Sequence, residues 1–174
     1  MPVGNRLSAA GLTAVGIVTA AAATGVWSEP GPIKISGGAE LSYSSRHAVD
    51  VPDHPGHQLV IGETKGANRN ASPRAYFPDA PVTNVEMADL TQGDGPHQGY
   101  YTMARGGDTV IAKWSGRVTT TMSREGQPNT NFAGTWRYMY GTGQYAGIMG
   151  SGTYRGHFVA ADRYAVTWQG SYTK

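Results

Sequence analysis

Two glutamates have the best placement for acid–base chemistry in this 174-residue chain. Glu63 shares the parity of Leu59 and Ile61 in a run of alternating residues, and Glu86 is related in the same way to the apolar residues of the run 82–90. Because side chains alternate faces along a strand, we expect each glutamate on the more apolar face, where an unpaired charge is costly. If both face a cavity, one of them has a raised pKa and acts as a general acid or base.

Both glutamates also have a plain structural interpretation. Each could be a carboxylate at the end of a strand that pairs with Lys65 or Arg117 or points to water. Tyr100 is a third candidate for catalysis, because a tyrosine hydroxyl can donate a proton or a hydrogen bond. The predicted catalytic residues are therefore Glu63, Glu86 and Tyr100.

Aromatic residues supply candidates for a binding pocket, because their rings stack on aromatic or polyene ligands. Trp114 and Tyr100 are the preferred pair for such a pocket, and Trp136 and Tyr138 follow in a neighbouring run. His57 is expected near the mouth of the barrel, as a ligand contact or a base. The alternative for most of these residues is core packing or a subunit interface. The predicted substrate-binding residues are His57, Trp114, Trp136 and Tyr138.

The segment 50–57 (DVPDHPGH) gathers carboxylates and imidazoles, namely Asp50, Asp53, His54 and His57. Such groups could ligate a divalent metal ion. The prolines and the glycine indicate an irregular loop, however, and the spacing matches no standard site, so we expect no metal. The chain has no G-x-S-x-G motif, and Gly141-Thr142-Gly143 lies between strands and does not open a helix. Neither a serine nucleophile nor a phosphate-bound cofactor is expected, and the predicted cofactor content is none.

Strands must position these candidates, because short runs of period two dominate the sequence after residue 56. The runs are 57–65, 82–90, 99–104, 109–122, 132–140, 152–159 and 164–172. Each run is bounded by glycine, proline or asparagine, and a long polar loop is expected over 66–81. The regular spacing predicts an all-β barrel or sandwich. Glycines between aromatic residues let strands coil tightly and leave room for large rings, which favours a small closed antiparallel barrel.

The first 56 residues are expected to lie outside the barrel domain, which is predicted over 57–174. Residues 1–27 have the pattern of a cleaved signal peptide: one positive charge, an uncharged apolar stretch and three alanines before the cleavage point. A membrane anchor is the alternative, but the stretch is rich in Ala, Thr and Gly and makes a weak span. Residues 28–56 are predicted to be a linker and an irregular segment, with room for a short helix over 39–49.

Composition narrows the function classes. Charged residues make up 15% of the chain and the formal net charge is +2, without a cluster of Lys and Arg, so a nucleic-acid partner is not expected. The chain has no cysteine, which excludes disulfides, thiolate metal sites and a cysteine nucleophile. Cleavage of the leader predicts a periplasmic or secreted protein without stable membrane insertion.

The segment from Gly134 to Tyr154 carries a family resemblance. Gly134-Thr135-Trp136, the run 141–147 (GTGQYAG) and the run 150–154 (GSGTY) resemble the C-terminal signature of allene-oxide-cyclase-like and dirigent-like barrels. The resemblance implies an eight-stranded antiparallel barrel with an apolar cavity, often assembled as a trimer. It also implies cyclisation or coupling of reactive small molecules, without a metal or organic cofactor.

Two functions remain open at this stage. The first is an exported barrel enzyme, a cyclase, isomerase or lyase that acts on a hydrophobic or aromatic small molecule. The second is a carrier or scaffold barrel that binds such a molecule without changing it. A third, purely structural interpretation requires side chains to fill the interior. The expected partners are a hydrophobic small molecule and further copies of the chain, a trimer by resemblance.

Overall fold

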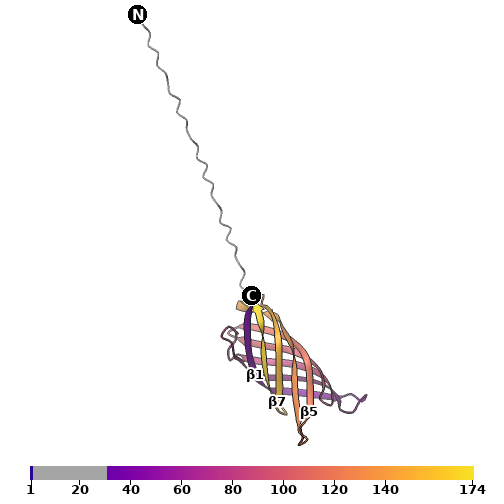
Figure 1. Cartoon of the computed structure of the whole chain (residues 1–174). Helices are drawn as coiled ribbons and strands as arrows, with labels where there is room; N and C mark the ends of the chain where they lie inside the picture. The colour runs from indigo at the N-terminus through magenta and orange to yellow at the C-terminus, as the bar shows by residue number, and fades with distance from the viewer. Residues whose placement is uncertain (2–30) are drawn as a thin grey trace.

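The computed structural model describes Met1 and residues 31–174, and the second of these parts forms one closed antiparallel β-barrel (Figure 1). The strands are β1 (Ile33–Asp50), β2 (His57–Asn70), β3 (Pro81–Thr91), β4 (Gly95–Arg105), β5 (Asp108–Met122), β6 (Pro128–Gly141), β7 (Met149–Ala160) and β8 (Arg163–Thr173), with a 3-10 helix η1 (Gly143–Tyr145). Each strand pairs with its neighbour in sequence, and β8 closes the sheet on β1. The predicted all-β barrel of eight antiparallel strands is confirmed.

The prediction of an irregular segment over 28–56 is wrong for residues 33–50, which form β1, a strand of 18 residues. The helix considered over 39–49 is wrong for the same reason. Glycine and serine interrupt the hydrophobic pattern of this strand, so it looks like a linker in the sequence. Its inner residues nevertheless enter the core, where Ile35 and Leu41 are buried. The predicted signal peptide, residues 1–27, lies outside the described residues apart from Met1.

The loop expected over 66–81 is shorter than predicted, because β2 continues to Asn70 and β3 begins at Pro81. Residues 71–80 form a loop at one end of the barrel, where Tyr76 and Phe77 pack against aromatic residues of β6, η1 and β8. The Tyr76 ring centre lies 4.2 Å from that of Tyr172 and 4.8 Å from that of Tyr145. Phe77 is buried with a φ of 55°, a strained value for a bulky residue, and the loop holds it there. We call this cluster of rings at one end of the barrel the aromatic plug.

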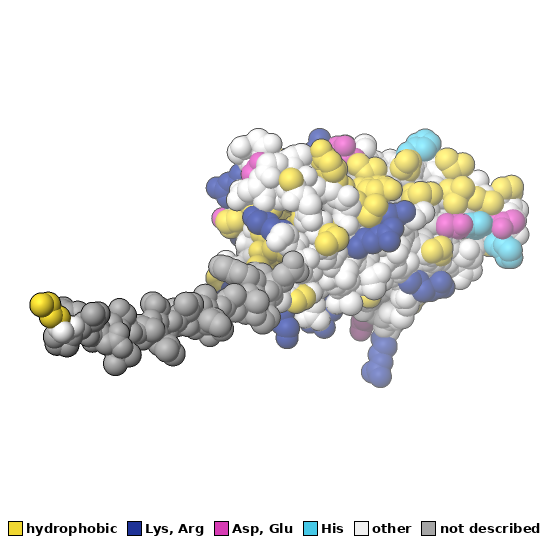
Figure 2. All heavy atoms as spheres, turned by 90° about the horizontal axis from the view of Figure 1, so that it is seen from above, with side chains coloured by type: hydrophobic (Ala, Val, Ile, Leu, Met, Phe, Trp, Pro, Cys, Tyr) yellow, Lys and Arg dark blue, Asp and Glu magenta, His cyan; other side chains and the backbone are white. Residues whose placement is uncertain are grey.

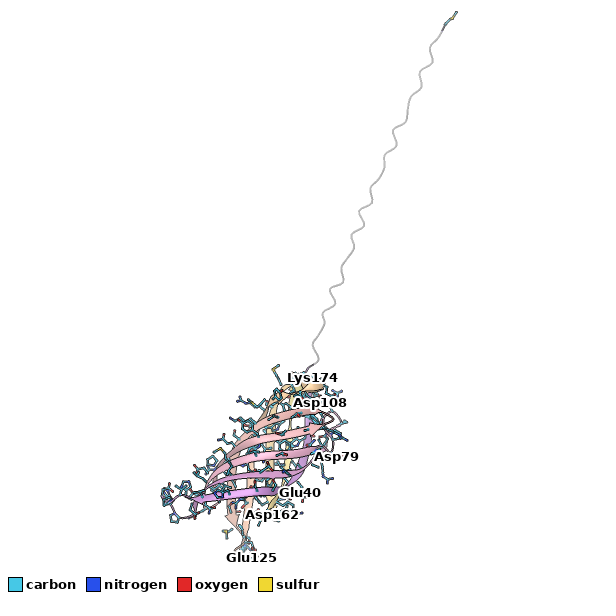
Figure 3. The ribbon with its side chains drawn as sticks, turned by 180° about the vertical axis from the view of Figure 1, so that it is seen from behind. Glu40, Asp79, Asp108, Glu125, Asp162 and Lys174 are labelled. Atoms are coloured by element: carbon cyan, nitrogen blue, oxygen red, sulfur yellow. The ribbon has the colours of Figure 1, made fainter. Side chains whose placement is uncertain are left out.

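The opposite end is formed by the four short turns that follow β1, β3, β5 and β7. Figure 3 shows Glu125 and Asp162, from two of these turns, at the far end of the barrel from Asp108 and Lys174. In the described part of the chain, no helix is long and apolar enough to cross a membrane.

Glycines on the inner face make room for tryptophan rings. A Cβ on Gly99 would lie 2.6 Å from Cζ2 of Trp114, closer than side-chain atoms approach one another. A Cβ on Gly152 or Gly170 would lie 2.7 or 2.6 Å from Cζ2 of Trp136. The indole rings therefore lie directly against the backbone of adjoining strands. This packing is the physical reason for the alternation of glycine with aromatic residues in the second half of the sequence.

The first prediction concerns this packing. Gly170→Ala places a methyl group against the Trp136 ring and the backbone of β7, and we expect it to lower the free energy of unfolding by about 1–3 kcal/mol. Urea unfolding followed by tryptophan fluorescence measures the loss. Gly31→Ala is the control, because a Cβ there meets no atom within 4 Å. Equal stability of the two variants would contradict the account of the inner face.

Candidate functional site

The barrel encloses a cavity of about 550 Å³. Its lining runs from Gly93, Gln127 and Ala161, in the turns of the open end, to Met103 and Tyr138 beside the aromatic plug. Most of the wall is aromatic or aliphatic. The interior is therefore not filled by its own side chains. A cavity of this kind can hold an apolar guest of small-molecule size and keep water away from it.

Glu86 lies on the cavity wall and is bound by three donors. Its carboxylate accepts hydrogen bonds from the Tyr43 hydroxyl, from the Tyr164 hydroxyl at 3.1 Å and from Nδ2 of Asn84 at 2.8 Å. Among the described residues that line the cavity, Glu86 is the one carboxylic acid.

Asn84 and Thr64 extend this hydrogen-bond network, because both contact the Tyr164 hydroxyl. The indole Nε1 of Trp114 donates to Oδ1 of Asn84 at 2.8 Å, which orients the amide so that its Nδ2 faces Glu86 and Tyr164. The Thr64 hydroxyl lies 3.0 Å from that of Tyr164. Asn84 and Thr64 are both almost fully buried, so this part of the network is shielded from solvent.

Burial raises the pKa of Glu86 above its ordinary value, because the apolar wall disfavours the charged form. Hydrogen bonds from Tyr43, Tyr164 and Asn84 oppose the rise, and so does the charge of Arg46. Burial and the nearby carboxylate raise the pKa of Tyr43 and of Tyr164, so both hydroxyls keep their protons and act as donors. The site thus holds a carboxyl group that can exchange a proton beside two hydroxyls that do not ionise.

A β-bulge brings Arg46 to the same wall. The pairing of β1 with β2 passes from Tyr43↔Thr64 to Ser45↔Glu63, so Ser44 is an extra residue and the following side chains change face. Arg46 consequently points into the mouth of the cavity, with Cζ 6.0 Å from the centre of the Tyr43 ring. The bulge supplies the guanidinium that faces Glu86.

His97 is a second titratable group on the wall. Its Nε2 lies 2.9 Å from the Tyr154 hydroxyl, and its ring packs 4.8 Å from that of Trp114. Burial lowers the pKa of His97 to about 4 and raises that of Tyr154. At neutral pH the imidazole is therefore uncharged, so that one of its ring nitrogens donates a hydrogen bond and the other accepts one.

Two buried donors beside the inner part of the cavity have no hydrogen-bond partner among the described residues. They are the Tyr101 hydroxyl and Nε1 of Trp168, and both residues belong to the cavity lining. Burial raises the pKa of Tyr101, so its hydroxyl also stays protonated. An unpaired buried donor is costly, and a ligand acceptor or a water molecule is the usual means of satisfying one.

Four of the residues predicted from sequence reach the cavity. Glu86, Trp114, Trp136 and Tyr138 all line it, and Trp114 is also part of the Glu86 network.

Three predicted site residues lie on the outside of the barrel, and their assignment to a pocket is wrong. Glu63 is paired with Lys65 at 2.9 Å, and the contact lowers the pKa of its carboxyl group. Tyr100 is 47% exposed and stacks beside Lys113. His57 lies in the β1–β2 turn region between Asp53 and Asp89.

The physical reason is that the more apolar face of β2 is the outer one. Leu59 and Ile61 are 46% and 58% exposed, whereas Thr64 and Asn68 on the opposite face are buried. These polar residues occupy the inside because their hydrogen bonds are satisfied there, Thr64 by the Tyr164 hydroxyl and Asn68 by the backbone carbonyl of Phe77. A rule that places the apolar face inside therefore assigns Glu63 to the wrong side.

Sequence reasoning missed the partners of Glu86. Asn84 shares the parity of Glu86 and could have been found from it. Tyr43 and Arg46 lie in the segment predicted to be irregular, and the bulge at Ser44 hides their common face. His97 precedes the predicted run 99–104 and shows no pattern of its own.

Comparisons with known proteins give one finding on fold. No protein-family model and no curated protein matches the sequence. Among solved structures, the chain is similar to a pterocarpan synthase dirigent protein, with 12% identity and a TM-score of 0.41 over 88% of this chain and 95% of that chain. The closed antiparallel barrel of eight strands that the sequence resemblance to dirigent-like barrels implies is the fold observed. The resemblance to allene oxide cyclases stays a prediction.

The second prediction concerns His97. Its ring protons should titrate with a midpoint near 4 in the folded protein and near 6.5 in urea. Because the unfolded state binds the proton first, the wild type should lose stability as the pH falls from 6.5 to 4. Over the same pH range, His97→Gln should lose less unfolding free energy than the wild type, by on the order of 2 kcal/mol. NMR titration and urea unfolding measure the two effects, and a folded midpoint near 6.5 would show that His97 is solvated.

Proposed function

We propose that the barrel binds a hydrophobic, partly aromatic small molecule in its cavity and that Glu86 moves a proton on that molecule. The observation that carries the proposal is a carboxyl group with a raised pKa on the wall of an otherwise apolar cavity. Carboxyl groups of this kind are typical general acids and bases near neutral pH. The reaction class is cyclisation, isomerisation or elimination without a cofactor.

In this mechanism Glu86 takes a proton from one atom of the bound molecule and returns it to another atom. The exchange is neutral in electrons, so it requires no oxidant or reductant. The hydroxyls of Tyr43 and Tyr164 stabilise the carboxylate while it holds the negative charge. The aromatic wall restricts the guest to few conformations and keeps competing water away. Arg46 at the mouth can stabilise negative charge that develops on the guest.

The two unpaired donors indicate which chemical group the guest carries at the end that enters the cavity first. Tyr101 and Trp168 would bind an acceptor oxygen or nitrogen on the end of the molecule that enters first. The preferred guest is thus an aromatic compound with a carbonyl, ether or similar acceptor at one end.

A carrier function is the second candidate, and one observation favours it. Glu86 already receives three hydrogen bonds within the protein, which occupy most of the acceptor sites of its two oxygens before a ligand arrives. A barrel that only binds its guest needs no free carboxylate. The two functions share the cavity and differ in the fate of the bound molecule.

Export and self-association complete the proposal. The leader sequence supports export to the periplasm or beyond. Val49, Leu59, Ile61, Val85, Met87 and Tyr100 are exposed on the outer face of β1 to β4. The pairs Ile61↔Met87 and Val85↔Tyr100 are adjacent across strands, which makes the patch continuous. Figure 2 shows hydrophobic side chains gathered along one side of the outer surface. A patch of this kind supports association of copies of the chain, as a trimer by resemblance.

The third prediction tests the cavity and Glu86 together. N-phenyl-1-naphthylamine should bind with one site per barrel, and Ala112→Trp should abolish binding because Ala112 is buried on the cavity wall. Ala133→Trp is the matched control, since Ala133 is exposed on the next strand.

Mass spectrometry then identifies molecules that co-purify with the wild type. Incubation of such a molecule with fresh wild-type protein should convert it, and Glu86→Gln should bind it but slow conversion about 100-fold or more. Equal conversion by both proteins would refute the role of Glu86. Binding without conversion by either protein would establish the carrier.

The fourth prediction concerns assembly. The chain lacking residues 1–27 should run as a trimer in light scattering, and a double variant, Ile61→Lys with Met87→Lys, should run as a monomer with the same circular dichroism. Both side chains are exposed, so the substitutions spare the core. A wild type that stays monomeric at high concentration would contradict the assembly.

A further inference from the structure

We propose that Asp53, His54 and His57 form a binding site for a divalent transition metal ion of the zinc type, on the turn between β1 and β2. The ligand atoms of these residues, one from each, lie within 4.8 Å of one another. The site is separate from the cavity, because none of the three residues belongs to the cavity lining. Figure 2 shows histidine side chains beside acidic ones at one end of the barrel.

The carboxylate of Asp53 lies between the two imidazoles. One of its oxygens, Oδ2, is 3.1 Å from Nδ1 of His54, and Oδ1 contacts Nδ1 of His57. Neighbouring ligand atoms around a tetrahedral zinc ion lie roughly 3.4 Å apart, so small side-chain rotations would convert this cluster into three ligands. Two imidazoles and one carboxylate suit zinc and its neighbours, whereas Mg²⁺ and Ca²⁺ prefer oxygen ligands alone.

Asp89 fixes the orientation of His57. Asp89 lies on β3, the strand next to β2, and its Oδ1 accepts a hydrogen bond from Nε2 of His57 at 2.7 Å. With its proton on Nε2, the ring can direct the Nδ1 lone pair to a metal ion. A carboxylate behind a histidine ligand is the usual outer partner in zinc sites, where it holds the ring and increases its basicity.

The turn itself is held in shape before any ion binds. Pro52 and Pro55 restrict the backbone, and Gly56 adopts a positive φ of 73° that the turn requires. The amide of Val51 donates to the carbonyl of His57 at 2.9 Å, and the amide of Gln92 donates to the carbonyl of Gly56 at 2.9 Å. Binding would therefore order little additional backbone, which favours affinity.

A protonated His57 between Asp53 and Asp89 accounts for part of the cluster, but it leaves His54 unexplained. The His54 side chain is 70% exposed and still turns its Nδ1 toward Asp53. An ion pair at such an exposed position contributes little. A shared metal ion explains why both imidazoles point to the same carboxylate, and the exposed side of the cluster leaves room for water ligands.

Isothermal titration of the full chain with ZnCl₂, after removal of metals by chelation, tests the proposal. We expect saturable binding of one ion per chain. His54→Ala and His57→Ala should each weaken it about tenfold or more, whereas His157→Ala, an exposed histidine on β7, should leave it unchanged. If His57→Ala fails to fold, the exposed His54→Ala variant still decides the matter.

Cobalt absorption supplies a second readout on the same proteins. Co²⁺ should give visible bands of a low-coordinate site in the wild type and lose them in His54→Ala. Absence of saturable Zn²⁺ binding, or equal binding by the wild type and both histidine variants, would overturn the site.

Discussion

The arrangement on which this structure depends is the burial of one carboxyl group among hydrogen-bond donors in an apolar barrel. Glu86 is surrounded by Tyr43, Tyr164 and Asn84, and each of these comes from a different position on the sheet. Desolvation raises the pKa of the carboxyl group, and the donors keep the charged form accessible. A group balanced in this way can hold either protonation state, which is the property that proton transfer requires.

The rest of the fold supports that balance. Inner-face glycines let Trp114 and Trp136 lie against the backbone, so large rings and an open cavity coexist in a barrel of eight strands. Trp114 in turn orients Asn84 toward the carboxylate. The aromatic plug packs at one end, and the bulge at Ser44 turns Arg46 into the cavity near the other end. The result is a cavity that reaches the turns at one end, has Glu86 on its wall and has two unpaired donors, Tyr101 and Trp168, in its lining.

The sequence predicted the architecture better than the site. Alternation and glycine spacing are local properties, so the strands after residue 56 and the closed barrel could be read directly. The inner face could not, because polar residues such as Thr64 and Asn84 satisfy one another inside while Leu59 and Ile61 lie outside. Parity placed Glu86 on the cavity side, where it lies, and placed Glu63 on the wrong side. The bulge in β1 depends on pairing with β2, a contact between distant segments that periodicity does not reveal.

The most direct measurement of the central claim is the titration of the Glu86 carboxyl carbon by ¹³C NMR in the full chain, with Glu86→Gln to assign the resonance. We expect a midpoint above the ordinary value of 4.5, and a further rise of the midpoint in Tyr43→Phe, because this variant loses a hydrogen bond that stabilises the carboxylate. A wild-type midpoint at or below 4.5 would mean that the carboxyl group is solvated or permanently ionised. The proposed proton transfer would then have no group to perform it.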